Sequence, residues 1–212
     1  MACRIVVLIS GSGTNLQALI DAAPKSGFSI EMVVSNKPGV FGLERAKKYK
    51  IPCKVIEHQS FGSREGFDRA LSSAIEKINP DLIVLAGFMR ILGAEFVRRF
   101  KNRILNIHPS LLPKYPGTNT HQRALNAGDK KHGATVHFVT EGLDCGPIIA
   151  QDSVLINPSD TAKTLAVKTL EKEHILYPQV VSWFASGRLK LENGKVLLDQ
   201  RVLSPTGSTT NS

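Results

Sequence analysis

The first half of the chain alternates apolar runs with segments that have the apolar spacing of a helix. Arg4–Ser10 contains an unbroken apolar stretch, and Leu16, Leu19 and Ile20 then recur at helical spacing within 15–23. The same alternation continues, which predicts strands at 30–35, 54–56, 82–86 and 104–108 and helices at 41–49, 64–78 and 94–100. Alternation of this kind is typical of a mostly parallel sheet with helices on both faces, so we predict an α/β, Rossmann-like fold.

The second half follows a different pattern. Residues 114–132 hold several turn-forming residues and a short helical piece at 121–127, which predicts a mobile surface excursion. We then expect strands at 133–139 and 147–156, one of them antiparallel, and a long helix at 161–184 interrupted by Pro178. Asn193-Gly194 predicts a terminal hairpin over 188–198. The prediction is one domain over 1–200, with halves 1–108 and 109–200, and a disordered tail over 203–212.

Composition narrows the class of protein. The chain has 212 residues and is 42% hydrophobic, but its apolar runs are far shorter than the ~20 residues that cross a bilayer. We therefore expect no membrane contact and a cytoplasmic location. The net charge of 27 − 18 = +9 is spread in ones and twos, which favours a solvated basic surface over a nucleic-acid partner. Three scattered cysteines suggest neither disulfides nor zinc, and the histidine spacing predicts no metal site.

The Gly-Ser-Gly-Thr-Asn segment between the first predicted strand and helix is a candidate phosphate-binding loop. Backbone N–H groups at a helix start favour an anion, and glycines let the backbone approach it closely. The residues are Gly11, Ser12, Gly13, Thr14 and Asn15. A tight turn with an N-cap from Thr14 or Asn15 has similar weight on this pattern alone. A dinucleotide-binding fingerprint would need a third glycine at position 16, where this chain has Leu16, and a Walker loop would need a Gly-Lys-Ser/Thr after the glycines, which is absent. Both kinds of nucleotide site are therefore disfavoured.

Asn106 and His108 lie two residues apart on a predicted strand that Pro109 ends, so their side chains should share one face at its carboxyl end. Open parallel sheets carry their chemistry at that edge. An amide and an imidazole can both donate to an oxygen that gains negative charge. A catalytic histidine usually needs an orienting carboxylate, and Asp144 lies in a glycine-flanked loop. The alternative is that His108 is a core histidine and Asp144 a turn former; three matched residue types favour acyl-transfer chemistry.

Four segments carry a resemblance to a known family. They are L-I-S-G-S-G-T-N-L from Leu8, L-A-G-F-M-R-I-L from Leu85, N-I-H-P-S-L-L-P from Asn106, and G-A-T-V-H-F-V-T-E-G-L-D-C-G from Gly133. Together they resemble the glycinamide ribonucleotide formyltransferases, folate-dependent enzymes of purine synthesis, to about Leu198. The resemblance implies a formyltransferase fold with a phosphate-binding first half and a second half that carries the folate and catalytic loops.

The resemblance also implies roles for single residues. Asn106, His108 and Asp144 match the catalytic trio, Gly11–Asn15 the substrate-phosphate loop, and Glu173 the acid that holds the ribose hydroxyls. The folate site is matched by Arg64, Met89, Arg90, Ile91, Leu92, Asn106, Thr140, Glu141, Gly142, Leu143 and Asp144. Several have plainer alternatives: Arg64 as a solvated charge, Met89 and Leu92 as core, and Glu173 as an exposed helix charge. The implied ligands are glycinamide ribonucleotide and 10-formyltetrahydrofolate, without metal, and the implied state is a monomer or weak homodimer.

The expected reaction is direct formyl transfer from 10-formyltetrahydrofolate to the ribonucleotide amine. One rival is a related chemistry on the same folate: a deformylase or another folate-dependent formyltransferase, such as one acting on aminoacylated tRNA. By the resemblance, the deformylase carries an extra domain ahead and the tRNA enzyme one behind, and 212 residues leave room for neither. A second rival, a nucleotide or nucleic-acid binder without catalysis, leaves Asn106, His108 and Asp144 unexplained.

Overall fold

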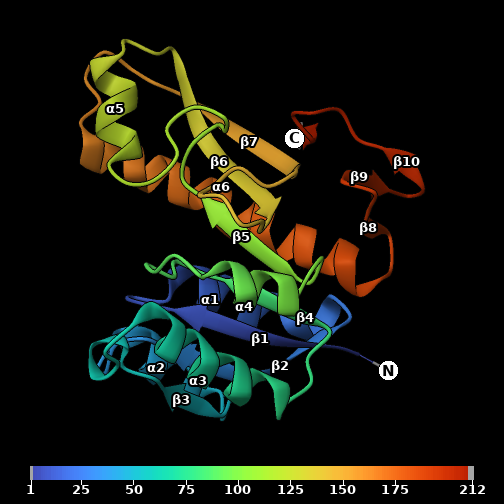
Figure 1. The fold of residues 1–212 in the computed structure, drawn as a ribbon. Coiled ribbons are helices and arrows are strands. Elements are labelled where there is room, and N and C mark those ends of the chain that lie inside the picture. The colour runs from blue at the N-terminus through green and yellow to red at the C-terminus, as the bar shows by residue number, and fades with distance from the viewer. Residues whose placement is uncertain (1, 210–212) are drawn as a thin grey trace. The chain divides into compact units, whose positions relative to one another are not determined.

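The structure, a computed structural model, describes residues 2–209 and divides into two compact units. Unit 1 is Met1–Asn106 and unit 2 is Ile107–Ser212. Figure 1 shows the helices and strands of each unit in chain order. Among the described helices, none is both long enough and apolar enough to cross a membrane.

Unit 1 contains the alternating strands and helices that the hydrophobic pattern predicts. Its elements are β1 (Cys3–Ile9), α1 (Thr14–Ala22), η1 (Ala23–Lys25), β2 (Phe28–Ser35), α2 (Phe41–Lys48), β3 (Cys53–Val55), η2 (His58–Ser60), α3 (Arg64–Glu76), β4 (Leu82–Leu85), α4 (Ala94–Arg99) and the start of β5 (Ile104–His108). Each predicted strand and helix of this half is present, with ends that differ by one to two residues at most boundaries.

The strands of unit 1 form a parallel sheet in the order β5-β4-β1-β2-β3. The chain moves outward from β1 to β3 and then returns through α3 to β4 on the other side of β1. Right-handed crossovers therefore place α1 and α2 on one face and α3 and α4 on the other. In agreement, α1 packs against α2 and α3 against α4. The carboxyl ends of β4, β1 and β2, which are neighbours, meet at one edge.

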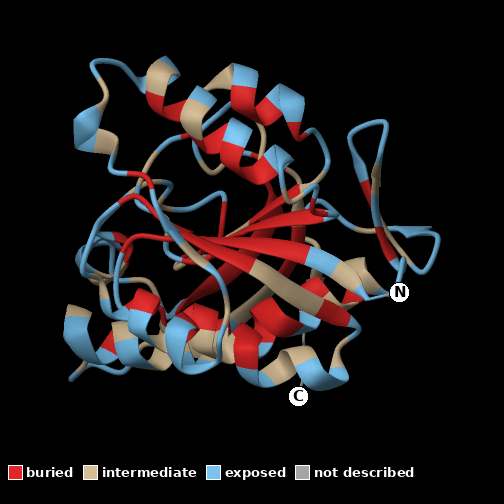
Figure 2. Cartoon of the chain, turned by 90° about the horizontal axis from the view of Figure 1, so that it is seen from below, coloured by how far each residue is buried: buried red, intermediate tan, exposed pale blue. Residues whose placement is uncertain are grey.

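The core of unit 1 is centred on β1. All five side chains of Ile5–Ile9 are fully buried, because helices cover both faces of a central parallel strand. Figure 2 colours residues by burial: the central strands are mostly red, which marks buried residues, while helices are red on one side and pale blue, or exposed, on the other. Burial on both faces explains why this strand reads as a continuous apolar run instead of an alternating one.

Unit 2 contains the end of β5 and then mostly antiparallel strands. Its further elements are α5 (Thr120–Asn126), β6 (Lys131–Phe138), β7 (Ile148–Leu155), α6 (Ala162–Ala185), β8 (Leu189–Glu192), β9 (Lys195–Leu198), β10 (Arg201–Val202) and β11 (Ser208–Thr209). β6 pairs antiparallel with β7, and α6 packs against both. β8, β9 and β10 form a separate antiparallel sheet, which includes the predicted hairpin.

Two predictions for unit 2 are wrong. α6 is not interrupted at Pro178 but runs without a break from Ala162 to Ala185. A proline cannot donate the backbone hydrogen bond of a helix, but Pro178 is buried with its neighbours Tyr177 and Val180, and this packing holds the helical backbone through it.

The second correction concerns the predicted disordered tail. Ser208–Thr209 forms β11, which pairs parallel with Ala150 and Gln151 of β7. The prediction of disorder from composition is therefore wrong at these two residues. Backbone pairing along the edge of β7 needs no particular side chain, which is why a Ser- and Thr-rich segment can supply it. Residues 210–212 of the predicted tail lie outside the described residues.

Candidate active site

The Gly11–Asn15 loop joins β1 to α1 at the carboxyl edge of the unit 1 sheet. Gly11 and Ser12 are exposed, and Gly13 is the N-cap of α1. Within the described residues, no side chain caps this helix start, so the predicted alternative of an N-cap from Thr14 or Asn15 is not what the structure has. Exposed backbone N–H groups at the positive end of a helix are suited to bind an anion.

Two contacts fix the backbone of this loop. Gly13 has a φ of +70°, and a Cβ there would lie 2.6 Å from the Cα of Gly42 in α2, so only glycine fits. The guanidinium of Arg45, also in α2, donates through Nε to the carbonyl oxygen of Ser12 at 2.9 Å. The loop is therefore shaped by backbone packing and by a positive charge that lies beside it.

The segment that follows β4 carries four of the predicted folate residues. Met89 and Ile91 are exposed by 71% and 46%, whereas Leu92 is buried. Burial of Leu92 is compatible with the plainer alternative of a core residue, whereas the exposure of Met89 is not. The exposed pair offers an apolar surface of the kind that binds an aromatic ring system.

Arg64 and Arg90 carry positive charge next to this segment. Arg64 is the first residue of α3, and the guanidinium of Arg90 lies 5.1 Å from the centre of the Phe67 ring. Arg90 Nε is buried and makes no hydrogen bond within the described part of the chain. A buried donor on a fixed cation is suited to an anionic ligand group such as a carboxylate.

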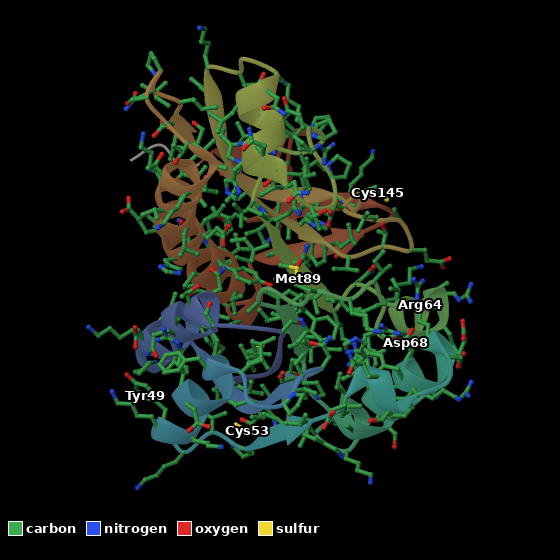
Figure 3. All side chains as sticks on the ribbon, turned by 90° about the vertical axis from the view of Figure 1, so that its left-hand side faces the viewer. Tyr49, Cys53, Arg64, Asp68, Met89 and Cys145 are labelled. Atoms are coloured by element: carbon green, nitrogen blue, oxygen red, sulfur yellow. The ribbon has the colours of Figure 1, made fainter. Side chains whose placement is uncertain are left out.

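Asp68 lies one turn after Arg64 on α3, as Figure 3 shows. Its Oδ2 accepts from the backbone N–H of Gly93 at 2.7 Å, which holds the end of the segment after β4. Burial raises the pKa of the Asp68 carboxyl, against the lowering effects of the Gly93 N–H and the charges of Arg64 and Arg90. Sequence reasoning did not identify Asp68, because an acid at a helix start has many other uses.

Asn106 and His108 lie two residues apart on β5, as predicted. Asn106 is half-buried and His108 is 6% exposed. Nε2 of His108 lies 2.9 Å from the carbonyl oxygen of Tyr115, and since a carbonyl only accepts, Nε2 carries a proton and donates it. Nδ1 of the same ring lies 3.4 Å from Oδ2 of Asp144. Both ring nitrogens therefore face oxygen atoms, an arrangement that suits a doubly protonated, charged imidazole.

Asp144 sits in the loop between β6 and β7 with a φ of +49° and a side chain that is 10% exposed. The backbone N–H of Gly117 donates to its Oδ2 at 2.8 Å. In the same loop, a Cβ on Gly146 would collide with the carbonyl oxygen of Phe138, so glycine is required there. The structure thus brings Asp144 beside His108, and its role in orienting the ring stays a prediction.

His137 also faces Asp144. Its Nε2 lies 3.8 Å from Oδ1 of Asp144, and its Nδ1 donates to the carbonyl oxygen of Phe138 at 2.9 Å. Burial lowers the pKa of His137, which favours the neutral ring. With its proton on Nδ1, a neutral ring presents a lone pair at Nε2, so His108 is the histidine suited to act as the charge partner of Asp144.

The remaining predicted residues of unit 2 differ in exposure. Glu173 is 7% exposed on α6, so it is not the exposed helix charge of the plainer alternative. Thr140 is half-buried, and Glu141, Gly142 and Leu143 are exposed. Tyr115 and Gly117, which hold His108 and Asp144, were missed because they contribute backbone atoms, which carry no sequence signal. Over residues 2–209, no group of His, Cys, Asp and Glu is arranged to hold a metal ion.

Comparison with known proteins identifies relatives over nearly the whole chain. Residues 3–181 match the family described as formyl transferase. The phosphoribosylglycinamide formyltransferase of Escherichia coli (strain K12) is 49% identical over 206 residues, which covers 96% of this chain and 97% of that protein. The human trifunctional purine biosynthetic protein adenosine-3 is 45% identical over 91% of this chain and 19% of its own length. A structure of phosphoribosylglycinamide formyltransferase from Coxiella burnetii has a TM-score of 0.95 at 50% identity, with 99% of both chains covered.

Proposed function

Because the chain belongs to the formyl transferase family, we propose that it transfers the formyl group of 10-formyltetrahydrofolate to the amine of glycinamide ribonucleotide. The products are the N-formyl ribonucleotide and tetrahydrofolate. The observation that carries the proposal is the buried His108–Asp144 pair, in which Nδ1 and Oδ2 are 3.4 Å apart. His108 follows Asn106 by two residues on β5. Within this family, that constellation suits stabilisation of a tetrahedral intermediate.

The chemistry needs no covalent intermediate with the protein. The amine nitrogen attacks the formyl carbon, the new C–N bond forms, and the bond from carbon to the folate nitrogen breaks. A water carries the proton from the amine to the departing folate nitrogen. Asn106 donates its side-chain N–H to the oxyanion, and charged His108 supplies a second donor. Removal of one such donor, in Asn106→Ala, should cost about a hundredfold or more in kcat.

Asp144 acts through His108. Its carboxylate keeps the imidazole oriented and favours the charged ring. Donation from Nε2 to a substrate oxygen requires that the carbonyl of Tyr115 release the N–H that it now accepts. Either the imidazole or the segment that holds Tyr115 must therefore shift before the proposed transition state forms.

The substrate-binding roles are those that the resemblance to the family implies. We assign the phosphate to the backbone of Gly11–Asn15, of which Gly11 and Ser12 are exposed, and the ribose hydroxyls to Glu173. For the folate, the exposed apolar side chains of Met89, Ile91 and Leu143 suit its ring system, and Arg64 and Arg90 suit its carboxylates. Leu92 and the Thr140–Asp144 loop complete the proposed set.

The test is the absorbance change of 10-formyltetrahydrofolate on addition of protein, with and without glycinamide ribonucleotide. Conversion should require the ribonucleotide and should fall about a hundredfold or more in Asp144→Asn, whose side chain keeps its size but loses its charge. Conversion without the ribonucleotide would identify a deformylase instead. Folded protein that converts nothing in either condition would refute the proposal.

A further inference from the structure

Three neighbouring strand ends of unit 1 are joined by two hydrogen bonds that centre on Ser10, one of them buried and the other partly buried. Ser10 follows β1 and directly precedes the Gly11–Asn15 loop, Asn36 follows β2, and Met89 lies in the segment after β4. The backbone N–H of Met89 donates to Ser10 Oγ at 2.8 Å. Ser10 Oγ donates in turn to Oδ1 of Asn36 at 2.6 Å.

The chemistry of the three groups fixes which of them donates in each of these two hydrogen bonds. A side-chain carbonyl oxygen cannot donate, so the single proton of Ser10 goes to Asn36, and its lone pair is left for the Met89 N–H. Ser10 and Asn36 are 6% and 2% exposed, so loss of the bond between them would leave the buried Oδ1 of Asn36 without this donor. Asn36 is also held through its backbone, because its main-chain carbonyl oxygen accepts a hydrogen bond from Nδ1 of His58 at 3.0 Å.

The segment that Met89 belongs to needs such anchors. Gly87, Met89 and Ile91 are exposed, so their side chains contribute little to holding its backbone. Ser10 fixes it at Met89, and Asp68 fixes its end through the Gly93 N–H. Ser10 is the anchor that also directly precedes the loop assigned to the substrate phosphate.

We propose that Ser10 is a positioning residue that couples the phosphate loop to the segment that binds the folate. This inference rests on the proposed function for its kinetic consequence but not for the hydrogen bond itself. Its hydroxyl, which is bonded to Asn36 and Met89, sets the place of the Met89 backbone through one hydrogen bond. The role predicts a change in folate affinity that is larger than the change in turnover.

The kinetic test compares Ser10→Ala with Ser72→Ala. Ser72 is 3% exposed on α3, so the control also removes a buried hydroxyl from unit 1 but leaves both loops unchanged. Ser10→Ala should raise KM for 10-formyltetrahydrofolate about tenfold, the value of the hydrogen bond to the Met89 N–H, with kcat within about twofold. Ser72→Ala should change neither, and Ser10→Thr, which keeps the hydroxyl, should restore most of the affinity.

A double-mutant cycle tests the route of the coupling. If Asn36 acts through Ser10, Asn36→Ala should raise the same KM in the wild-type background and add little in Ser10→Ala. Additive effects of the two substitutions on KM would show that Asn36 and Ser10 act separately and would overturn the proposed coupling through Ser10. An unchanged KM in folded Ser10→Ala would overturn it as well.

A readout without catalysis separates this inference from the proposed function. Hydrogen exchange of the Met89 amide, followed by NMR, should be slow in the wild-type protein and in Ser72→Ala and at least about tenfold faster in Ser10→Ala. A wild-type protein with no formyl transfer but with this exchange pattern would refute the function and retain the hydrogen bond. A rapidly exchanging Met89 amide in the wild-type protein would overturn the inference even if Ser10→Ala fails to fold.

Discussion

The Gly11–Asn15 loop of unit 1 and the His108–Asp144 pair of unit 2 are built from different kinds of group. The loop offers backbone N–H groups at the start of α1 and is shaped by the contact of Gly13 with Gly42. The pair consists of ionisable side chains, held by the backbones of Tyr115 and Gly117. A site made of backbone should tolerate loss of side chains, whereas a site made of ionisable side chains should not. Substitutions in the loop and in the pair should therefore differ in their effects.

The largest effect is expected at the ionisable pair. His108→Ala should lower kcat about a hundredfold or more, because a charged donor is lost from the oxyanion. If the pair acts as a unit, combining it with Asp144→Asn should add less than about tenfold. Single-turnover rates of the two single variants and the double variant are the measurement. Fully multiplicative losses would show that Asp144 has a role independent of His108.

The next effect concerns the backbone of the phosphate loop. Gly13→Ala introduces a Cβ at a φ of +70° and 2.6 Å from the Cα of Gly42. Strain and overpacking together should lower the free energy of unfolding by about 2–4 kcal/mol and raise KM for the ribonucleotide. Urea denaturation measures the first effect. Gly62→Ala is the matched control, since a Cβ there meets nothing within 4 Å and should leave stability within about 1 kcal/mol.

Acid should weaken unit 2 in particular. Five of the six histidines lie there, and burial lowers the pKa of His132 to about 4, with a further contribution from His121. The folded-state pKa of His132 lies below its ordinary value of 6.5, so the unfolded chain binds the proton first. Its contribution to stability is present above pH 6.5 and is lost as pH falls toward 4.

The measurement is urea denaturation at several values between pH 7 and pH 4.5. His132→Gln should reduce the pH slope of the unfolding free energy by up to about 1.4 kcal/mol per pH unit, the limit for one proton. Hydrogen exchange at pH 5 should show β6, which holds His132, opening before β1. An unchanged slope in His132→Gln would contradict the lowered pKa.

The same contrast explains what the sequence could predict. The strands and helices of unit 1 could be predicted because Ile5–Ile9 is buried on both faces and every crossover repeats the strand–helix–strand pattern. The residue types at 106, 108 and 144 could be picked out because few other roles need them together. Tyr115 and Gly117 could not, since their backbone atoms depend on loops with φ values of +57° and +79°. The unbroken helix through Pro178 and the pairing of Ser208–Thr209 depend on tertiary packing, which overrides local preference.

The smallest effect is expected for a side chain of the phosphate loop. If backbone N–H groups hold the phosphate, Ser12→Ala should raise KM for the ribonucleotide by less than about threefold and leave kcat unchanged. Arg45→Met should have the larger effect, about five- to tenfold, because the Arg45 guanidinium holds the Ser12 carbonyl and adds positive charge. Steady-state kinetics with the ribonucleotide as the varied substrate compares the two. A hundredfold rise in Ser12→Ala would mean that the hydroxyl is the main donor, and the contrast between the backbone site and the side-chain site would then fail.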